Sequence, residues 1–264
     1  MTMQRKELPF FNVIAGSTAT LTLPNGMTYE RLMLQMGGTT FNKTHITDIR
    51  MRVNGKVIHQ CNAADLESIN AYSGLATDSK FITIDFTELF ARDQVGQSIG
   101  ALGTVNGVSQ AVVEVDIAGT AVAPQLTCWS IISGPRQLTV CNKMLKYNFN
   151  IAAAGKWPLA LPYGNQGGSI IKRIYIKSNT ANGLEIKKNG TVIHESVKEV
   201  NEFWQKENKK TPQAGYYIFD PIVDNNQTDM LSTSDCVSFE VNPTFSGPET
   251  ITVYVEYIDL LGNL

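Results

Sequence analysis

The sequence predicts an all-β protein made of two tandem jelly rolls, each with one short inserted helix. Three observations carry this prediction: a repeat at half the chain length, short alternating strands between turn residues, and one helical segment at the same place in each half. The repeat is clearest in Asn54–Gln60 (Asn-Gly-Lys-Val-Ile-His-Gln). It returns 135 positions later as Asn189–Glu195 (Asn-Gly-Thr-Val-Ile-His-Glu) in a chain of 264 residues. So long a period indicates a duplicated domain rather than a solenoid of short repeats.

Two further blocks extend the repeat in the same order. Ile82–Asp85 corresponds to Tyr217–Asp220, again 135 positions later, and Leu21–Gly26 corresponds to Leu159–Gly164, 138 positions later. Several blocks in one order make duplication the simplest explanation.

The two halves meet near Ser133-Gly134-Pro135. Gly followed by Pro breaks regular structure, and no long polar linker surrounds it. Each half also ends in an alternating apolar run, Val112–Ile117 in the first half and Ile251–Ile258 in the second, and we take these two runs as a further matched pair of the repeat. We therefore expect an N-terminal domain over 1–134 and a C-terminal domain over 135–264, packed side by side.

Alternating segments of β type fill most of both halves. In the first half we expect strands at Ala19–Leu23, Tyr29–Gln35, Ile46–Val53, Val57–Gln60, Phe81–Phe86, Val108–Ile117 and Gln125–Ile132. In the second we expect Gln137–Phe149, Lys156–Leu161, Ile170–Lys177, Leu184–Lys188, Val192–Glu195, Tyr216–Asp220, Val237–Val241 and Ile251–Ile258. The Asn-Gly pairs at 54–55 and 189–190 suit a type I′ turn, which needs positive φ at both central residues. The best-preserved repeat element is therefore a tight hairpin.

One helical segment follows each hairpin. Residues 62–72 place Ala64, Leu66, Ile69 and Tyr72 on one face, and residues 196–207 do the same with Val197, Val200, Phe203 and Trp204. Ser196, with Glu199 three residues later, fits a capping box. A helix inserted at the same point among about eight strands in both halves describes two jelly rolls.

Composition narrows the function classes. Lys and Arg number 22 and Asp and Glu number 24, for a net charge of −2, and neither half is basic, so we expect no direct nucleic-acid binding. No apolar stretch approaches the roughly 20 residues of a membrane-spanning helix. The first ten residues do not resemble a secretory signal, so we expect synthesis in a cytoplasm.

Motifs for chemistry are scarce. We find no catalytic motif and predict no catalytic or cofactor-binding residues. His59 and His194 are repeat partners, which favours structural positions because a catalytic residue rarely needs a copy in both domains. The oxygen-rich segment after Asp220 offers Asp224, Asn226 and Asp229 as calcium candidates. It lacks the glycine and terminal glutamate of an EF-hand, so a plain polar loop is the favoured interpretation.

The chain resembles the double jelly-roll major capsid proteins of membrane-containing icosahedral phages, and above all the corticovirus-like coat proteins. The resembling segments are Phe11–Gly38, Ile46–Tyr72, Ile82–Phe86, Val200–Asp220 with Pro212-Gln213-Ala214-Gly215, and Val253–Tyr257. They span nearly the whole chain, and they are structural rather than catalytic.

The resemblance implies a homotrimer of pseudo-hexagonal outline that tiles an icosahedral shell over an internal lipid membrane. It implies contacts with neighbouring trimers, with penton and minor capsid proteins and with the membrane on the inner side, after synthesis in a bacterial host's cytoplasm. We further expect residues 1–10 to face that membrane, with Arg5 and Lys6 near its headgroups.

Other function classes stay open. A tandem β-sandwich that binds carbohydrate, or a virion spike, would have the same strand pattern. A cupin-like enzyme is disfavoured because paired His and Glu ligands are absent from the sequence.

Overall fold

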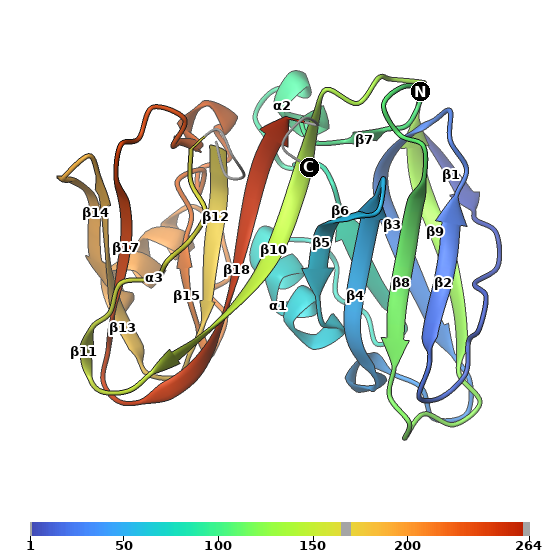
Figure 1. The fold of residues 1–264 in the computed structure, drawn as a ribbon, viewed down its shortest axis with the longest axis horizontal. Helices are drawn as coiled ribbons and strands as arrows, with labels where there is room; N and C mark the ends of the chain where they lie inside the picture. The colour runs from blue at the N-terminus through green and yellow to red at the C-terminus, as the bar shows by residue number, and fades with distance from the viewer. Residues whose placement is uncertain (1, 165–169, 261–264) are drawn as a thin grey trace.

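The computed structural model describes residues 2–164 and 170–260. Two lobes lie side by side (Figure 1): the N-terminal lobe holds strands β1 to β9 and the C-terminal lobe holds β10 to β18. β9 ends at Ser133 and β10 begins at Val140. The division into domains between residues 134 and 135 stays a prediction, which separate expression of each half would test.

Two sheets face each other in the N-terminal lobe. One has the order β1-β9-β3-β6, with β7 paired to β3, and the other has the order β2-β8-β4-β5. The strands are β1 (Met3–Lys6), β2 (Thr18–Leu23), β3 (Thr28–Gly37), β4 (Ile46–Val53), β5 (Lys56–Cys61), β6 (Phe81–Asp85), β7 (Leu102–Gly103), β8 (Ala111–Ile117) and β9 (Gln125–Ser133). Alternate residues are buried along β8, from Ala111 to Ile117, as expected for a strand with one face on the core.

The C-terminal lobe repeats this arrangement strand for strand. Its sheets have the orders β10-β18-β12-β15 and β11-β17-β13-β14. The strands are β10 (Val140–Ile151), β11 (Gly155–Lys156), β12 (Ile170–Lys177), β13 (Ala181–Lys188), β14 (Thr191–Val197), β15 (Tyr216–Phe219), β16 (Leu231–Ser232), β17 (Phe239–Phe245) and β18 (Glu249–Leu260). Two matching pairs of sheets confirm the predicted double jelly roll.

A parallel pairing joins the lobes. β5 lies beside β10 (Figure 1), with His59 opposite Met144, so one sheet of each lobe merges into a continuous nine-stranded sheet. The two lobes are therefore connected by backbone pairing as well as by side chains.

The strand predictions need corrections. By position in the sheets, β8 corresponds to β17 and β9 to β18, so pairing the runs Val112–Ile117 and Ile251–Ile258 as repeat partners is wrong. Alternation marks any half-buried strand and does not say which strand it is. The expected strand Lys156–Leu161 is reduced to β11 and an isolated bridge between Leu159 and Val241. The short strands β1, β7 and β16 were not predicted.

Both Asn-Gly turns are confirmed as type I′ hairpins. The φ angles are 52° and 82° at Asn54 and Gly55, and 51° and 79° at Asn189 and Gly190. Asn54 Oδ1 accepts the backbone N–H of Ser109 at 2.8 Å. Asn189 Oδ1 accepts that of Val237 at 2.7 Å. Each turn is thus fixed to the neighbouring loop by the same bond, which explains why Asn stands at both positions.

Helices follow both hairpins, as predicted, with differences in detail. α1 (Ala63–Ser73) begins after its N-cap Asn62, and Ala64 is exposed rather than buried. α3 (Lys198–Glu207) has Val197 at its N-cap with no side-chain cap. The predicted cap at Ser196 is wrong because Ser196 still belongs to β14 and its hydroxyl donates to the Val197 carbonyl.

The N-terminal lobe also contains a second α-helix, α2 (Gln94–Ser98), so one helix per half is wrong for that lobe. Its five residues are too few to show a helical period. The single turns η1 (Lys43–His45) and η2 (Gln227–Asp229) complete the helical segments of the described chain.

Candidate assembly interfaces

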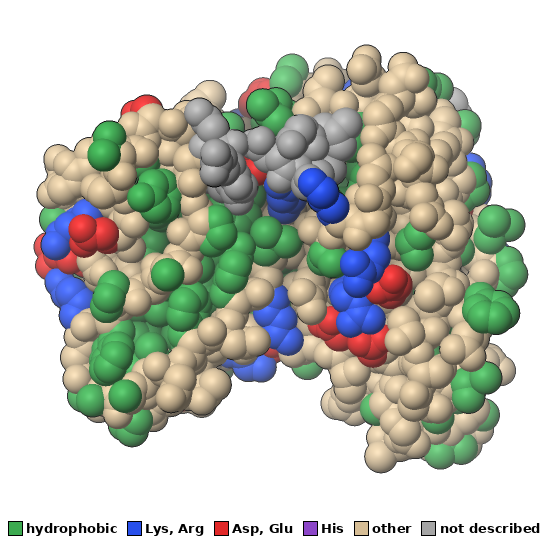
Figure 2. All heavy atoms as spheres, viewed as in Figure 1, with side chains coloured by type: hydrophobic (Ala, Val, Ile, Leu, Met, Phe, Trp, Pro, Cys, Tyr) green, Lys and Arg blue, Asp and Glu red, His purple; other side chains and the backbone are tan. Residues whose placement is uncertain are grey.

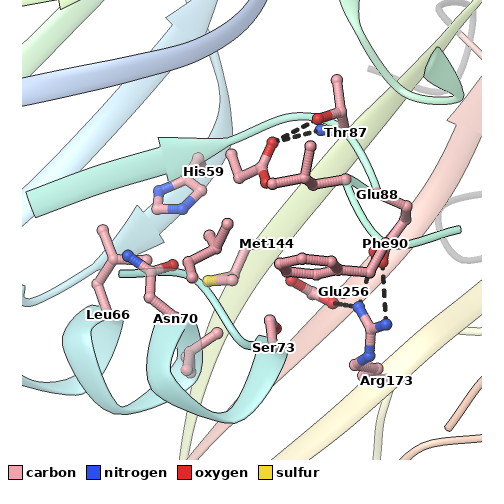
Figure 3. Close-up of a pocket in the computed structure, with 14 residues that line it drawn as sticks. His59, Leu66, Asn70, Ser73, Thr87, Glu88, Phe90, Met144, Arg173 and Glu256 are labelled. Atoms are coloured by element: carbon pink, nitrogen blue, oxygen red, sulfur yellow. Dashed lines mark hydrogen bonds and ion pairs between the residues drawn. The ribbon is translucent and has the colours of Figure 1, made fainter. Parts of the chain in front are cut away.

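The junction between the lobes is held by a buried cluster of charges around Arg173 on β12 (Figure 3). Two guanidinium nitrogens of Arg173 donate to the Glu88 carboxylate, at 2.7 and 3.0 Å. A third contact of 3.1 Å reaches Glu256 on β18, and Nε lies 3.1 Å from Asp220 Oδ2. Glu88 belongs to the N-terminal lobe, so Arg173 links the lobes by a two-bond contact that Lys cannot reproduce.

The cluster is electrostatically matched despite its burial. Lys172 Nζ also lies 2.6 Å from Glu88 Oε1. Burial alone would raise the pKa of Glu88, but the positive charges of Arg173 and Lys172 outweigh it and hold that pKa well below its ordinary value. Burial disfavours the Arg173 cation, yet the carboxylates of Asp220 and Glu88 raise the pKa of Arg173 above its ordinary range. Glu88 and Arg173 therefore both stay charged in the interior.

Helix α1 covers one face of the C-terminal lobe with a second buried carboxylate. Asp65 accepts hydrogen bonds from the hydroxyls of Tyr216 and Tyr254, at 2.8 and 2.6 Å, and from Lys177 Nζ at 2.6 Å. About two turns further along α1, the ring of Tyr72 meets Tyr175 edge to face, with centroids 6.1 Å apart. α1 thus seals the junction with polar contacts to the β10-β18-β12-β15 sheet.

The two histidines occupy matching positions. His59 lies opposite Met51 and His194 opposite Ile186, and each lies beside a β-bulge in its hairpin. Burial lowers the pKa of His59 to about 4 and also lowers that of His194. His59 faces a cavity of about 30 Å³ at the junction, whereas His194 is half-exposed against Phe219.

Helix α3 is covered on the face opposite to the predicted one. Val200, Phe203 and Trp204 are 60, 62 and 53% exposed, and the buried residues are Asn201 and Gln205. Both buried amides donate to the carbonyl of Ile218, at 2.7 and 2.9 Å. The apolar residues of α3 do share one face of the helix, as predicted, but within this chain that face is exposed to solvent.

A mixed cluster of charges lies on the outer face of β4 and β8, where Figure 2 shows adjoining basic and acidic side chains on the N-terminal lobe. Arg50 pairs with Asp48, Glu114 and Asp116 at 2.7 to 2.9 Å. The pairs to β8 span more than 60 residues of sequence, so the chain pattern alone did not reveal them.

The three calcium candidates lie in one loop, where their oxygens already have partners. Asp224 Oδ2 pairs with Arg92 at 2.8 Å and its Oδ1 accepts the backbone N–H of Asn226. Asn226 in turn donates to Asp229 at 3.0 Å. Within residues 2–164 and 170–260, no group of three or more His, Cys, Asp or Glu side chains is placed to hold a metal ion. Calcium binding by this loop stays a prediction for a titration to test.

The N-terminal segment is a strand rather than a free arm. Arg5 donates to the buried Glu7 carboxylate and to the Tyr29 hydroxyl, so its charge is already paired. Lys6 lies 5.8 Å from the ring centroid of Trp129. The expected contact of this segment with a membrane stays a prediction. In the described part of the chain, no helix has the length and apolar character needed to cross a bilayer.

Comparison with known families gives two matches in chain order. Residues 4–133 match the family described as viral coat protein P2 N-terminal domain. Residues 141–261 match viral coat protein P2 C-terminal domain. Together they take in nearly all of the chain.

Individual relatives agree. The major capsid protein P2 of Pseudoalteromonas phage PM2 is 26% identical over 199 residues, which cover 72% of this chain and 71% of that protein. The crystal structure of PM2 P2 matches with a TM-score of 0.90 at 20% identity, over 98% of both chains. The STIV major capsid protein matches with a TM-score of 0.70 at 13% identity, over 98% of this chain and 97% of that one. These structural matches show a shared fold.

Proposed function

The chain belongs to the viral coat protein P2 family and is a major capsid protein rather than an enzyme, and we propose that it works as a homotrimer of pseudo-hexagonal outline. The observation that carries this proposal is the strand-for-strand identity of the two lobes. Three chains related by a three-fold axis then present six similar lobes in a closed ring. A ring of six similar lobes fits a hexagonal lattice.

These trimers tile an icosahedral shell over an internal lipid membrane. Neighbouring trimers, penton and minor capsid proteins and the membrane on the inner side are the partners, and the chain is made in the cytoplasm of a bacterial host. The membrane and the minor partners rest on the family resemblance. The near-neutral charge of the chain, −2 overall, supports assembly without direct contact to the genome.

Two measurements test this function. Light scattering of the purified protein should give three times the chain mass of 29.0 kDa, and a monomer at micromolar concentration would refute the trimer. Gel analysis and imaging of purified particles should show this chain as the dominant protein of a shell closely applied to a bilayer. A minor band would instead favour the alternative of a carbohydrate-binding or spike protein.

A further inference from the structure

We infer that a second copy of this chain docks its α3 and β14 onto the β1-β9-β3-β6 sheet, repeating between chains the contact that α1 and β5 make with the C-terminal lobe. This inference rests on the proposed homotrimer and names the surfaces that build it. The inference is based on the internal repeat. Because the two lobes are alike, the contact between them within one chain is a template for the contact between the C-terminal lobe of one chain and the N-terminal lobe of the next.

Strand register fixes which residues correspond. In the N-terminal lobe, Ile131 on β9 lies between Gln4 on β1 and Arg31 on β3. In the C-terminal lobe, Glu256 on β18 lies between Met144 on β10 and Arg173 on β12. The two ladders also shift register at the same place, just before Arg31 and just before Arg173. Gln4 and Arg31 therefore correspond to Met144 and Arg173.

The same registers identify a matching sheet face. Met33 and Trp129 pair as Tyr175 and Tyr254 do. Gln35 and Phe81 pair as Lys177 and Tyr216 do. Met33, Phe81 and Trp129 form what we name the open face; its counterpart of Tyr175, Tyr216 and Tyr254 is the covered face.

The two faces differ in burial. The covered face lies under α1, with its tyrosines at most 5% exposed. On the open face Phe81 is 37% exposed, and the groove there has a volume of about 540 Å³ with Met33, Trp129 and Gln4 also lining it. A face that is buried in one lobe is therefore partly open to solvent in the other.

The helices correspond residue by residue. Asn70 of α1 donates to the carbonyl of Thr83, and Gln205 of α3 donates to that of Ile218. The two donors, Asn70 and Gln205, are 135 positions apart, and so are the two acceptors and the two hairpin asparagines. At this spacing Asp65 of α1 corresponds to Val200 of α3. One turn further along the helices, Ser68 corresponds to Phe203.

The chemistry changes on both sides together. Within the chain, Asp65 meets two tyrosine hydroxyls and an ammonium group. In the repeated contact, Val200 meets Phe81, Trp129 and Gln35, none of which brings a tyrosine hydroxyl or a charge. The Trp129 indole N–H is already satisfied by Gln35 at 2.8 Å. The apolar helix face thus corresponds to the apolar side chains Met33, Phe81 and Trp129, with the charged groups of Lys6 and Asp78 beside them. Apolar groups flanked by charged ones are the arrangement expected of an interface.

The strand edges are also available. β14 ends one sheet of the C-terminal lobe and β1 ends one sheet of the N-terminal lobe, at opposite outer edges of the molecule (Figure 1). Since Met144 lies opposite His59 in the parallel β10–β5 pairing, Gln4 of one copy should lie opposite His194 of the next. Such a head-to-tail contact closes into a ring, and six lobes close after three chains.

A charge on α3 tests the docking surface. Val200→Asp should weaken association by roughly 100-fold, because the carboxylate would lose its water against the rings of Phe81 and Trp129. Phe11→Asp, at a 77% exposed residue outside the surface, should leave the trimer intact. Adding Phe81→Tyr, Trp129→Tyr and Gln35→Lys to Val200→Asp recreates the three groups around Asp65 and should restore most of the association.

Cross-linking tests the register. Gln4→Cys and His194→Cys in one chain, in a Cys236→Ser background, should give disulfide-linked trimers after mild oxidation, whereas each single variant should not. If the wild type and the Val200→Asp variant are both trimeric and no cross-link forms, the proposed docking surface is refuted. The proposed trimer is not. A monomeric wild type overturns both.

Discussion

Helices α1 and α3 occupy the same position in the two lobes but present opposite chemistry. α1 places Asp65 against tyrosine hydroxyls of the same chain, whereas α3 exposes Val200, Phe203 and Trp204. The buried sides are alike, since each helix holds the neighbouring strand through an inward amide. The comparison teaches that duplication kept the inner attachment and changed the outer face. Polar groups serve the contact made within the chain, and apolar groups are left for a contact outside it.

The strongest test of the covered junction is Arg173→Met. The variant keeps the volume but leaves Glu88, Asp220 and Glu256 as buried carboxylates with fewer cations. Removing one partner of a buried ion pair costs about 3–5 kcal/mol, so urea unfolding should show a loss of this size. Arg50→Met removes a cation from the partly exposed cluster on β4 and β8 and should cost about 1 kcal/mol. Equal losses at the two sites would contradict the special role of the junction.

The reciprocal exchange on the helices comes next. Asp65→Val leaves the hydroxyls of Tyr216 and Tyr254 buried without their acceptor and should cost about 3 kcal/mol of unfolding free energy. Val200→Asp, at a 60% exposed position, should change the stability of the isolated monomer by less than about 0.5 kcal/mol. Both values come from denaturant unfolding in dilute solution. A large loss in the Val200→Asp monomer would mean that α3 is covered within its own chain.

Acid should separate the two histidines. In the unfolded chain His59 takes up a proton below about pH 6.5, but in the fold its pKa is about 4. The unfolded state therefore binds more protons in this window, and stability falls as the pH drops. Between pH 7 and 4.5 the contribution of His59 amounts to about 2.5 kcal/mol.

Four other charged side chains, Asp85, Glu88, Glu256 and Arg173, line the same cavity, so the measurement is the difference between wild type and His59→Gln at each pH. The variant should lose less stability on acidification. His194→Gln, at the half-exposed position, should behave more like the wild type. Identical pH profiles for wild type and His59→Gln would rule out a neutral buried imidazole.

The smallest effect concerns the helix starts. Asn62 caps α1 by accepting the backbone N–H of Asp65 at 2.7 Å, so Asn62→Ala should cost about 1 kcal/mol. Ser196→Ala should cost less than about 0.5 kcal/mol, because Ser196 caps nothing. Thermal unfolding at one scan rate compares the pair, and a larger loss for Ser196→Ala would restore the capping box that the sequence suggested.

The sequence predicted features whose causes are local. The hairpins at Asn54 and Asn189 follow from the backbone freedom of Asn-Gly, and most strands follow from alternation. It could not say which face of α3 is covered, because a helical period gives an apolar stripe without its partner. Arg173 and Lys172 carried a signal that was overlooked. Two adjacent cations inside a largely apolar strand, Ile170–Lys177, require buried acids, and two of these, Glu88 and Glu256, lie more than 80 residues away.

The placement of α3 late in the chain has a consequence for synthesis. A ribosome completes the N-terminal lobe while about half of the chain remains to be made, which takes roughly 10–30 s at ordinary elongation rates. During that time the charged groups of Asp65 and Glu88, which are later buried at the junction, are exposed to solvent on the nascent N-terminal lobe. Helix α3 has not yet been synthesised. Neighbouring chains on one polysome therefore cannot engage through α3 until residues 198–207 have emerged, when about three quarters of the sequence is outside the ribosome. The order of the lobes delays coat assembly until each subunit is nearly finished.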